Sequence, residues 1–224
     1  MKRKIVLSMA FILAAIPEFY GCQSVFSKND SETLTTSSVL SDETISQTEY
    51  ENSIDENISF FYQKDSRWED DNLGDSKYKM NDSGCLTCCV ASVLAMSGYL
   101  SDALPENYNA GDVNKYFSEN NVYDNEGNML WEKLENLTGF TVEKTEKGDI
   151  SEDLLDSYLN SGCYPVIRVR VNGNGNYHYV LITDKRDGEY RCMDPLCSEN
   201  KTVPISQFKN KIYAVRCLVK YIKK

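Results

Sequence analysis

The sequence predicts an α+β fold in which several helices precede an antiparallel sheet. Between Cys85 and Asn160, apolar residues recur at the spacing of helices. After Gly162 they alternate with polar residues, as in strands, and turns rich in Asn, Gly and Asp separate the runs. Helices grouped ahead of strands indicate an α+β architecture, and 224 residues suffice for one well-filled domain with appendages.

Residues 1–22 have the layout of a secretory signal peptide. Three basic residues precede an apolar run from Ile5 to Ile16, which is shorter than the roughly 20 residues that a membrane-spanning helix needs. The Gly21-Cys22 pair resembles the lipobox of bacterial lipoproteins, in which the cysteine is lipidated. We therefore expect export and a lipid at Cys22, which would hold the protein at the extracellular face of the cell membrane. Ordinary secretion and a single spanning segment are the alternatives.

Residues 23–58 differ in composition from the rest of the chain. They are rich in Ser, Thr, Asp, Glu and Asn, with isolated apolar residues that follow no period. Such a segment cannot bury enough apolar surface to offset the entropy of ordering it. We expect a disordered acidic tether here, with the folded domain over residues 59–224.

The overall charge argues against a nucleic-acid partner. The chain has 24 Lys and Arg against 34 Asp and Glu, which gives a net charge of -10. A chain of this charge repels polyanions and offers no basic footprint for phosphate backbones.

The helical part begins with an irregular segment in which aromatic residues crowd together. The Ser83-Gly84 turn then leads into "CLTCCVASVLAMSGYL", whose small and apolar residues predict a central buried helix that ends at Gly98. Trp68 and Trp131 are expected to be core residues, with a platform for the substrate as the alternative. Apolar residues at helical spacing predict three more helices, over residues 110–119, 130–137 and 150–160.

Four strands are expected after Gly162. The turns "NGNGN" and "RDGE" separate the first three, and a closing strand completes an antiparallel series. The strands are predicted over residues 164–171, 177–185, 190–196 and 213–222.

Four side chains form the set that a cysteine hydrolase needs. His178 is the only histidine of the chain, so it would supply any imidazole. Asp194 ends the next strand, where antiparallel pairing can bring its carboxylate to the far ring nitrogen. Cys85 begins the buried helix, where the helix dipole favours a thiolate, and Gln63 could donate its amide to a tetrahedral oxyanion.

A family resemblance rests on five segments between residues 60 and 222. In chain order they are "YQKDSRW", "SGCLTCCVASVLAMSGY", "SGCYPVIRVRV", "HYVLITDK" and "MDP". Together they resemble the papain-like cysteine peptidases of the double-glycine leader type and their stand-alone secreted relatives. The run Thr87-Cys88-Cys89 departs from that family, in which proline, threonine or serine and alanine are frequent at these positions.

The resemblance implies a papain-like fold, a peptide or protein substrate and no cofactor. It implies that Cys85 is the nucleophile, His178 the base, Asp194 the residue that orients it, and Gln63 part of the oxyanion hole. We expect a monomer whose substrate specificity the sequence does not reveal.

Other interpretations of the cysteines stay open. Cys85 and Cys88 match C-x-x-C, a redox pair or half of a zinc site, but a second pair at suitable spacing is missing. Cys88 and Cys89 are expected to pack in the core. In an exported protein four further cysteines are disulfide candidates of unreadable connectivity: Cys163, Cys192, Cys197 and Cys217.

Two other functions compete with a peptidase. One is a cysteine amidase that acts on peptidoglycan stem peptides through similar chemistry on a related fold. The other is a binding module that kept the fold and lost turnover. The "YQKDSRW" segment and the long separation of Cys85 from His178 favour the peptidase layout over the amidase. Because all four candidate site residues are intact, loss of activity by drift is disfavoured.

Overall fold

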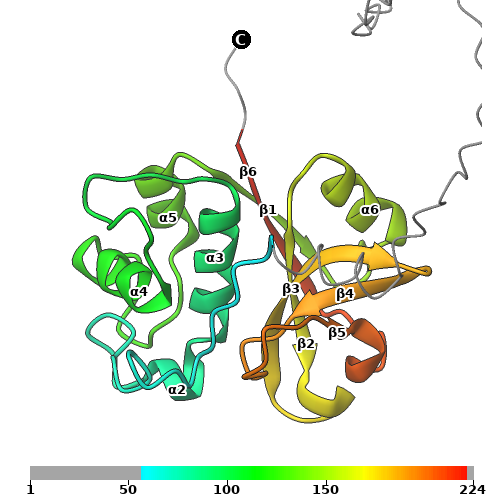
Figure 1. Cartoon of the computed structure of the whole chain (residues 1–224), viewed down its shortest axis with the longest axis horizontal. Helices are drawn as coiled ribbons and strands as arrows, with labels where there is room; N and C mark the ends of the chain where they lie inside the picture. The colour runs from blue at the N-terminus through cyan, green and yellow to red at the C-terminus, as the bar shows by residue number, and fades with distance from the viewer. Residues whose placement is uncertain (1–56, 221–224) are drawn as a thin grey trace, which may run out of the picture. The chain divides into compact units, whose positions relative to one another are not determined.

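The computed structural model describes residues 57–220, which form a group of helices beside a sheet (Figure 1). The helices that precede the sheet are α2 (Met80–Ser83), α3 (Cys85–Met96), α4 (Ala110–Glu119) and α5 (Trp131–Thr138). The elements that follow are β1 (Thr141–Glu146), α6 (Glu152–Asn160), β2 (Pro165–Arg170), η1 (Val171–Gly173), β3 (Tyr177–Arg186), β4 (Glu189–Met193), β5 (Val203–Pro204), η2 (Ile205–Phe208) and β6 (Ala214–Val219). The predicted α+β class is confirmed by this arrangement.

The sheet has six strands in the order β1-β6-β2-β3-β4-β5, and every neighbouring pair is antiparallel. The closing strand β6 lies inside the sheet, with Glu143 of β1 and Pro165 of β2 both opposite Cys217. Strand β1 is not predicted by the sequence, because its segment "TVEKTE" has one buried residue, Val142. Its strand conformation comes from pairing with β6, which is distant in sequence.

Most predicted helices are confirmed within two residues. Helix α4 spans the predicted residues because Asn109 caps it: its side chain accepts hydrogen bonds from the N–H groups of Gly111 and Asp112. Helix α6 begins at Glu152 rather than at residue 150, since Ser151 accepts a hydrogen bond from the N–H of Leu154 as its N-cap.

The third predicted strand, residues 190–196, is too long at its C-terminal end. Strand β4 stops at Met193, and the next residues form a turn in which the N–H of Cys197 donates to the carbonyl of Asp194 at 2.9 Å. Pro195 has no N–H to donate to a sheet ladder, which is the physical reason for the earlier end. Asp194 therefore lies in a turn at the sheet edge and not within a strand.

Helix α3 is the buried centre of the helical group, as predicted. Every residue from Thr87 to Leu94 is buried, and the helix packs on a sheet face that presents Val166, Leu181 and Leu218. The opposite sheet face packs against α6 and η2, where Phe208 is fully enclosed. The sheet is therefore covered on both sides, and the start of α3 lies beside β3 (Figure 1).

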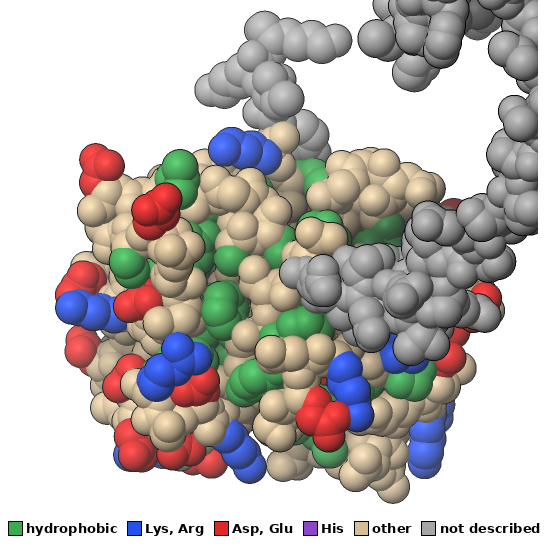
Figure 2. Space-filling view, in the orientation of Figure 1, with side chains coloured by type: hydrophobic (Ala, Val, Ile, Leu, Met, Phe, Trp, Pro, Cys, Tyr) green, Lys and Arg blue, Asp and Glu red, His purple; other side chains and the backbone are tan. Residues whose placement is uncertain are grey.

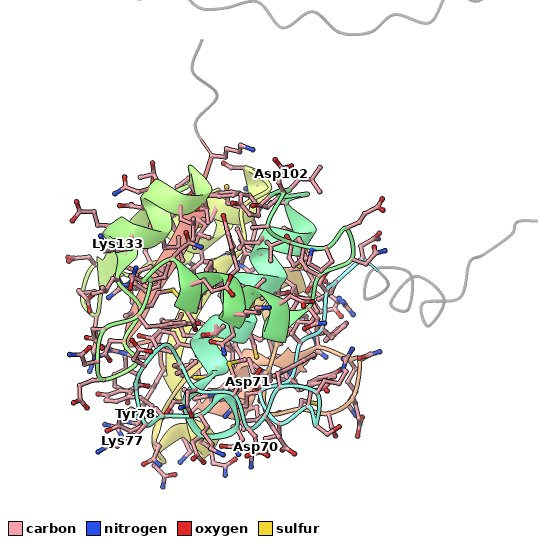
Figure 3. All side chains as sticks on the ribbon, turned by 90° about the vertical axis from the view of Figure 1, so that its left-hand side faces the viewer. Asp70, Asp71, Lys77, Tyr78, Asp102 and Lys133 are labelled. Atoms are coloured by element: carbon pink, nitrogen blue, oxygen red, sulfur yellow. The ribbon has the colours of Figure 1, made fainter. Side chains whose placement is uncertain are left out.

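The irregular segment before α2 is held by its aromatic residues. Trp68 is buried, as expected, and its indole N–H donates to the carbonyl of Tyr62 at 2.8 Å. Figure 3 shows Tyr78 and Lys77 together, and the Lys77 ammonium lies 5.3 Å from the centre of the Tyr78 ring. The hydrogen bond from Trp68 holds the backbone at Tyr62, directly before Gln63.

Several sequence predictions fall on residues 1–56, outside the described part of the chain. These are the signal peptide, the lipid at Cys22 and nearly all of the acidic tether, so each remains a prediction. Among residues 57–220 no helix has both the length and the apolar character needed to cross a membrane.

Candidate active site

Cys85 is the first residue of α3, and a tight backbone approach sets its position. A Cβ atom added at the preceding Gly84 would lie 2.5 Å from the carbonyl oxygen of Met80 and 2.7 Å from its sulfur. Only glycine allows α2 and α3 to come this close. The thiol consequently lies at a helix N-terminus, where unpaired N–H groups and the helix dipole favour a negative charge.

The three neighbouring cysteines have different environments. Cys88 and Cys89 are fully buried, and burial raises the pKa of both thiols well above the ordinary value. Both stay neutral and act as core residues, in agreement with the packing prediction. Cys85 is half-buried and borders a cleft, so among these three thiols only Cys85 can meet a substrate.

His178 and Asp194 form a buried pair. The distance between Nε2 of His178 and Oδ1 of Asp194 is 2.6 Å, and the two residues are 3% and 5% exposed. Because Leu181 of β3 pairs with Met193 of β4, the start of β3 lies next to the turn that carries Asp194. The N–H of Leu196 donates to the same carboxylate oxygen at 2.9 Å and holds it in place.

The protonation of His178 follows from these contacts. Burial acts to lower its pKa, but hydrogen bonds with Asp194 and with the Cys85 thiol outweigh burial and raise the pKa to about 9. Since Nε2 binds Asp194, the other ring nitrogen, Nδ1, is left to face Cys85. At neutral pH the ring is therefore an imidazolium positioned between a carboxylate and a thiol.

Gln63 connects the two segments that flank this pair. Its side chain is buried, and its amide Nε2 donates to the carbonyl of Asn81, one helical turn before Cys85, at 2.7 Å. Its backbone N–H donates to the carbonyl of Pro195, next to Asp194, at 3.0 Å. The four residues selected from the sequence thus belong to one constellation.

Cys85 opens onto a cleft of about 660 Å³ between the helical group and the sheet. Figure 2 shows hydrophobic side chains along the junction of these two parts. Tyr177 and Tyr179 of β3 form the sheet side of the cleft, and Trp131 lines the helical side. A cleft of this volume matches those that hold several residues of a peptide or a small ligand.

The cleft residues were not identified from the sequence as site residues. Tyr177 and Tyr179 flank the single histidine, and this position next to His178 could have marked them as candidate site residues. The expectation that Trp131 belongs to the core is wrong in part, since its half-buried ring packs against the core and also borders the cleft.

His178 and Asp194 line a second hollow, of about 360 Å³, on the other side of the thiol–imidazole contact. Phe208 forms part of its wall, and the centres of the Phe208 and His178 rings are 6.5 Å apart. The cleft and this hollow lie on different sides of β3, because side chains alternate along a strand: His178 faces the side of the sheet opposite to Tyr177 and Tyr179.

The remaining cysteines differ from the sequence expectation. No disulfide occurs among residues 57–220, and the four candidates Cys163, Cys192, Cys197 and Cys217 are thiols. Cys192 is enclosed in the core, where burial raises its pKa, whereas Cys197 lies beyond the Asp194 turn and points to the carbonyl of Glu199. Within the same range, no group of three or more His, Cys, Asp or Glu side chains could hold a metal ion.

Comparison with known proteins finds matches only among solved structures. No family model matches the chain, and no curated protein matches it. Six solved chains do, among them a Bacillus anthracis protein provisionally described as a C39-like peptidase. It is 15% identical, the match covers 75% of this chain and 96% of that chain, and the TM-score is 0.49. A likeness at this identity and TM-score determines neither the family nor the activity of this chain.

Proposed function

We propose that this protein is a papain-like cysteine peptidase that cleaves peptide or isopeptide bonds at Cys85. The observation that carries the proposal is the 2.6 Å contact between His178 and Asp194, made by an imidazole that also contacts a half-buried thiol at a helix N-terminus. Nucleophile, base and orienting group are thereby present in the order that thiol catalysis requires.

The first half of the reaction would form a thioester. The Cys85 thiolate attacks the carbonyl carbon of the scissile bond, and the carbonyl oxygen takes the negative charge. The C–N bond then breaks as the His178 imidazolium gives its proton to the leaving amine. The amine departs, and the acyl group stays on the sulfur.

The second half would return the enzyme to its starting state. His178, now neutral, takes a proton from water, and the resulting hydroxide attacks the thioester carbonyl. The C–S bond breaks and releases the carboxylic acid together with the Cys85 thiolate beside the imidazolium. The sum is one water consumed for one bond cleaved, and no cofactor takes part in any step.

Asp194 and Gln63 would support these steps without bonding to the substrate carbon. Asp194 accepts from Nε2 of His178, so it keeps Nδ1 directed at the sulfur and stabilises the imidazolium. Gln63 uses one amide hydrogen on the carbonyl of Asn81, and its second amide hydrogen could serve the oxyanion together with the N–H of Cys85.

The site of action that we propose is outside the cell. A signal peptide over residues 1–22 and a lipid at Cys22 would hold a monomeric enzyme at the extracellular face of the membrane, on a tether of residues 23–58. Peptides or proteins at that face would be the substrates.

The proposal is tested by thiol labelling. We expect brief treatment with limiting iodoacetamide at about pH 6 to modify Cys85 first, because its sulfur borders the cleft and contacts the His178 imidazolium. Intact-mass measurement and peptide mapping would show a single label. Cys163 and Cys197, which are also half-buried, are internal controls.

A second variant sharpens the labelling test. In His178→Ala the preference for Cys85 should disappear, and labelling should spread over the accessible thiols at a lower rate. Equal labelling of Cys85, Cys163 and Cys197 in the unaltered protein would contradict the proposed nucleophile.

Gln63→Ala is expected to reduce kcat by about 10²–10³-fold with a small change in KM, because the lost donor acts on the oxyanion and not on the bound substrate. The variant also loses the hydrogen bond to Asn81, which costs about 1 kcal/mol of stability. Steady-state kinetics and urea unfolding would separate the two effects.

Asn114→Ala is a matched control for Gln63→Ala. The Asn114 side chain is also buried, and its amide donates to the carbonyl of Asn72 at 3.0 Å, on the helical group and outside the cleft lining. It should lose comparable stability and keep kcat. If both variants lose the same small fraction of activity, Gln63 has only a structural role.

A further inference from the structure

Three arginines lie on the sheet face whose tyrosines line the Cys85 cleft. In the β2–β3 register, Arg168 lies opposite Tyr179 and Arg170 lies opposite Tyr177, the two tyrosines that line the cleft. Arg216 of β6 lies opposite Val166 of β2, so it belongs to the same face of the sheet. Strand pairing thus gathers three positive charges on the face that borders the cleft, although the whole chain has a net charge of -10.

Aromatic rings hold these guanidinium groups in place. The guanidinium carbons of Arg170 and Arg168 lie 4.1 Å and 4.9 Å from the centre of the Tyr177 ring, which is half exposed. That of Arg216 lies 5.9 Å from the centre of the Trp131 ring, across the cleft. Arginines stacked on aromatic rings lose little entropy on binding a ligand, because their side chains are already ordered.

The positive charge of the cluster is only partly neutralised. Glu146 is the carboxylate that pairs with it, at 2.6 Å from Arg216 and 4.0 Å from Arg168. Arg170 donates to the carbonyl of Gly175 and has no ion pair among the described residues. One carboxylate against three guanidinium groups leaves a net charge of about +2 at this end of the cleft.

The hydrogen-bonding capacity of the cluster is also incomplete. Nε of Arg168 and Nε of Arg216 are shielded from solvent and have no acceptor among residues 57–220. A guanidinium binds a carboxylate side-on through Nε and one Nη, and here Nη2 of both arginines faces Glu146 while Nε is unused. A shielded donor without an acceptor is unfavourable, so these two guanidinium groups keep unused hydrogen-bonding capacity.

The arginine cluster and the Cys85 thiol act on the same cleft residue, Tyr179. The hydroxyl of Tyr179 interacts with both: burial raises its pKa, Arg168 and Arg216 oppose that rise, and Cys85 adds to it. The helical side of the cleft carries the opposite charge, since Asp82 and Glu126 line it. A negatively charged ligand is therefore favoured on the sheet side alone.

From these observations we infer that Arg168, Arg170 and Arg216 form a carboxylate-binding subsite of the Cys85 cleft, and that the preferred substrates are peptides with a carboxylate near the scissile bond. The carboxylate could belong to an acidic side chain or to the C-terminus of the peptide. This inference rests on the proposed peptidase function, because it takes the cleft to be the substrate site.

Peptide binding tests the subsite without turnover. The protein would carry Cys85→Ala, and the probes would be short acetylated alanine peptides with one glutamate, with a free C-terminal carboxylate, or with neither. We expect isothermal titration calorimetry to give at least about 10-fold tighter binding of a carboxylate peptide than of its glutamine or amide counterpart. The preference should shrink as the salt concentration rises. Which of the two carboxylate probes binds identifies the source of the carboxylate.

Single-charge variants connect the preference to the cluster. Arg170→Gln and Arg168→Gln should each bring the affinity ratio of the paired peptides close to one. Lys115→Gln, which removes one positive charge from the exposed surface of α4, should preserve the ratio. Arg216 is mostly buried against Glu146, so the two more exposed arginines carry the test.

The outcomes separate this inference from the peptidase proposal. Equal binding of the paired peptides, absence of binding by every probe, or a preference that survives in both arginine variants would overturn the subsite. None of these results concerns hydrolysis, which is measured on the unaltered protein with a mixed peptide library. If carboxylate peptides bind preferentially but no peptide in the library is cleaved, the subsite stands and the peptidase proposal fails.

Discussion

Cys85→Ala and His178→Ala are each expected to abolish hydrolysis, with a loss of kcat on the order of 10⁶-fold, because nucleophile and base act as one unit. The alanine at position 85 removes only a half-buried sulfur, so its fold should persist. A mixed peptide library with mass-spectrometric readout would measure the residual activity. Circular dichroism and urea unfolding would verify that both variants are folded.

Cys163→Ala provides the matched control for the nucleophile. Cys163 is half-buried like Cys85, but it lies beside Cys217 on the other face of the sheet. Its removal should leave hydrolysis unchanged. Full activity in Cys85→Ala or in His178→Ala, or equal losses in Cys163→Ala and Cys85→Ala, would remove the basis of the proposed mechanism.

Asp194→Asn is expected to lower kcat by roughly 10²–10⁴-fold and to shift the pH profile. The Asp194 hydrogen bond is one of the contacts that raise the pKa of His178 to about 9 against the effect of burial. Without the carboxylate, the hydrogen bond and the charge of Asp194 no longer raise the pKa of His178, which therefore falls. The alkaline limb of kcat/KM, where the imidazolium loses the proton meant for the leaving amine, should therefore move from about pH 9 to lower pH.

The raised pKa of His178 also makes the stability of the fold depend on pH. Because the pKa of His178 is higher in the folded protein than its unfolded value of about 6.5, its contribution to stability is fully present below pH 6.5 and is lost as pH rises through about 9. In Asp194→Asn this decline should weaken. Urea unfolding between pH 6 and pH 9.5 measures it.

Asp156→Asn is the control for the carboxylate. Asp156 also accepts hydrogen bonds within the sheet half, from Lys185 at 2.9 Å and Tyr190 at 2.6 Å, but it lies away from Cys85. It should change neither kcat nor the alkaline limb. An unshifted alkaline limb in Asp194→Asn would mean that another group sets the protonation of His178.

Local sequence predicted most elements of the fold. Asn109 and Ser151 cap their helices through contacts within three residues, so the helix positions could be predicted closely. The alternation of apolar and polar residues around Val166 is also a local pattern, and it predicted β2. Strand β1 could not be predicted, because "TVEKTE" gains its conformation from β6, about 70 residues away in sequence. The papain-like assignment remains part of the proposed function.

The candidate site also has a part that the sequence predicts and a part that depends on the tertiary structure. The sequence by itself determined the chemistry that is available: one histidine in the chain, and a cysteine placed after a glycine at a helix start. Only the tertiary structure decided the arrangement. The 2.6 Å contact of His178 with Asp194 depends on the β3–β4 pairing, and the β2, β3 and β6 register puts the arginines on the same sheet face as the cleft tyrosines. Such contacts join residues far apart in the chain, and local periodicity contains no information about which strands pair.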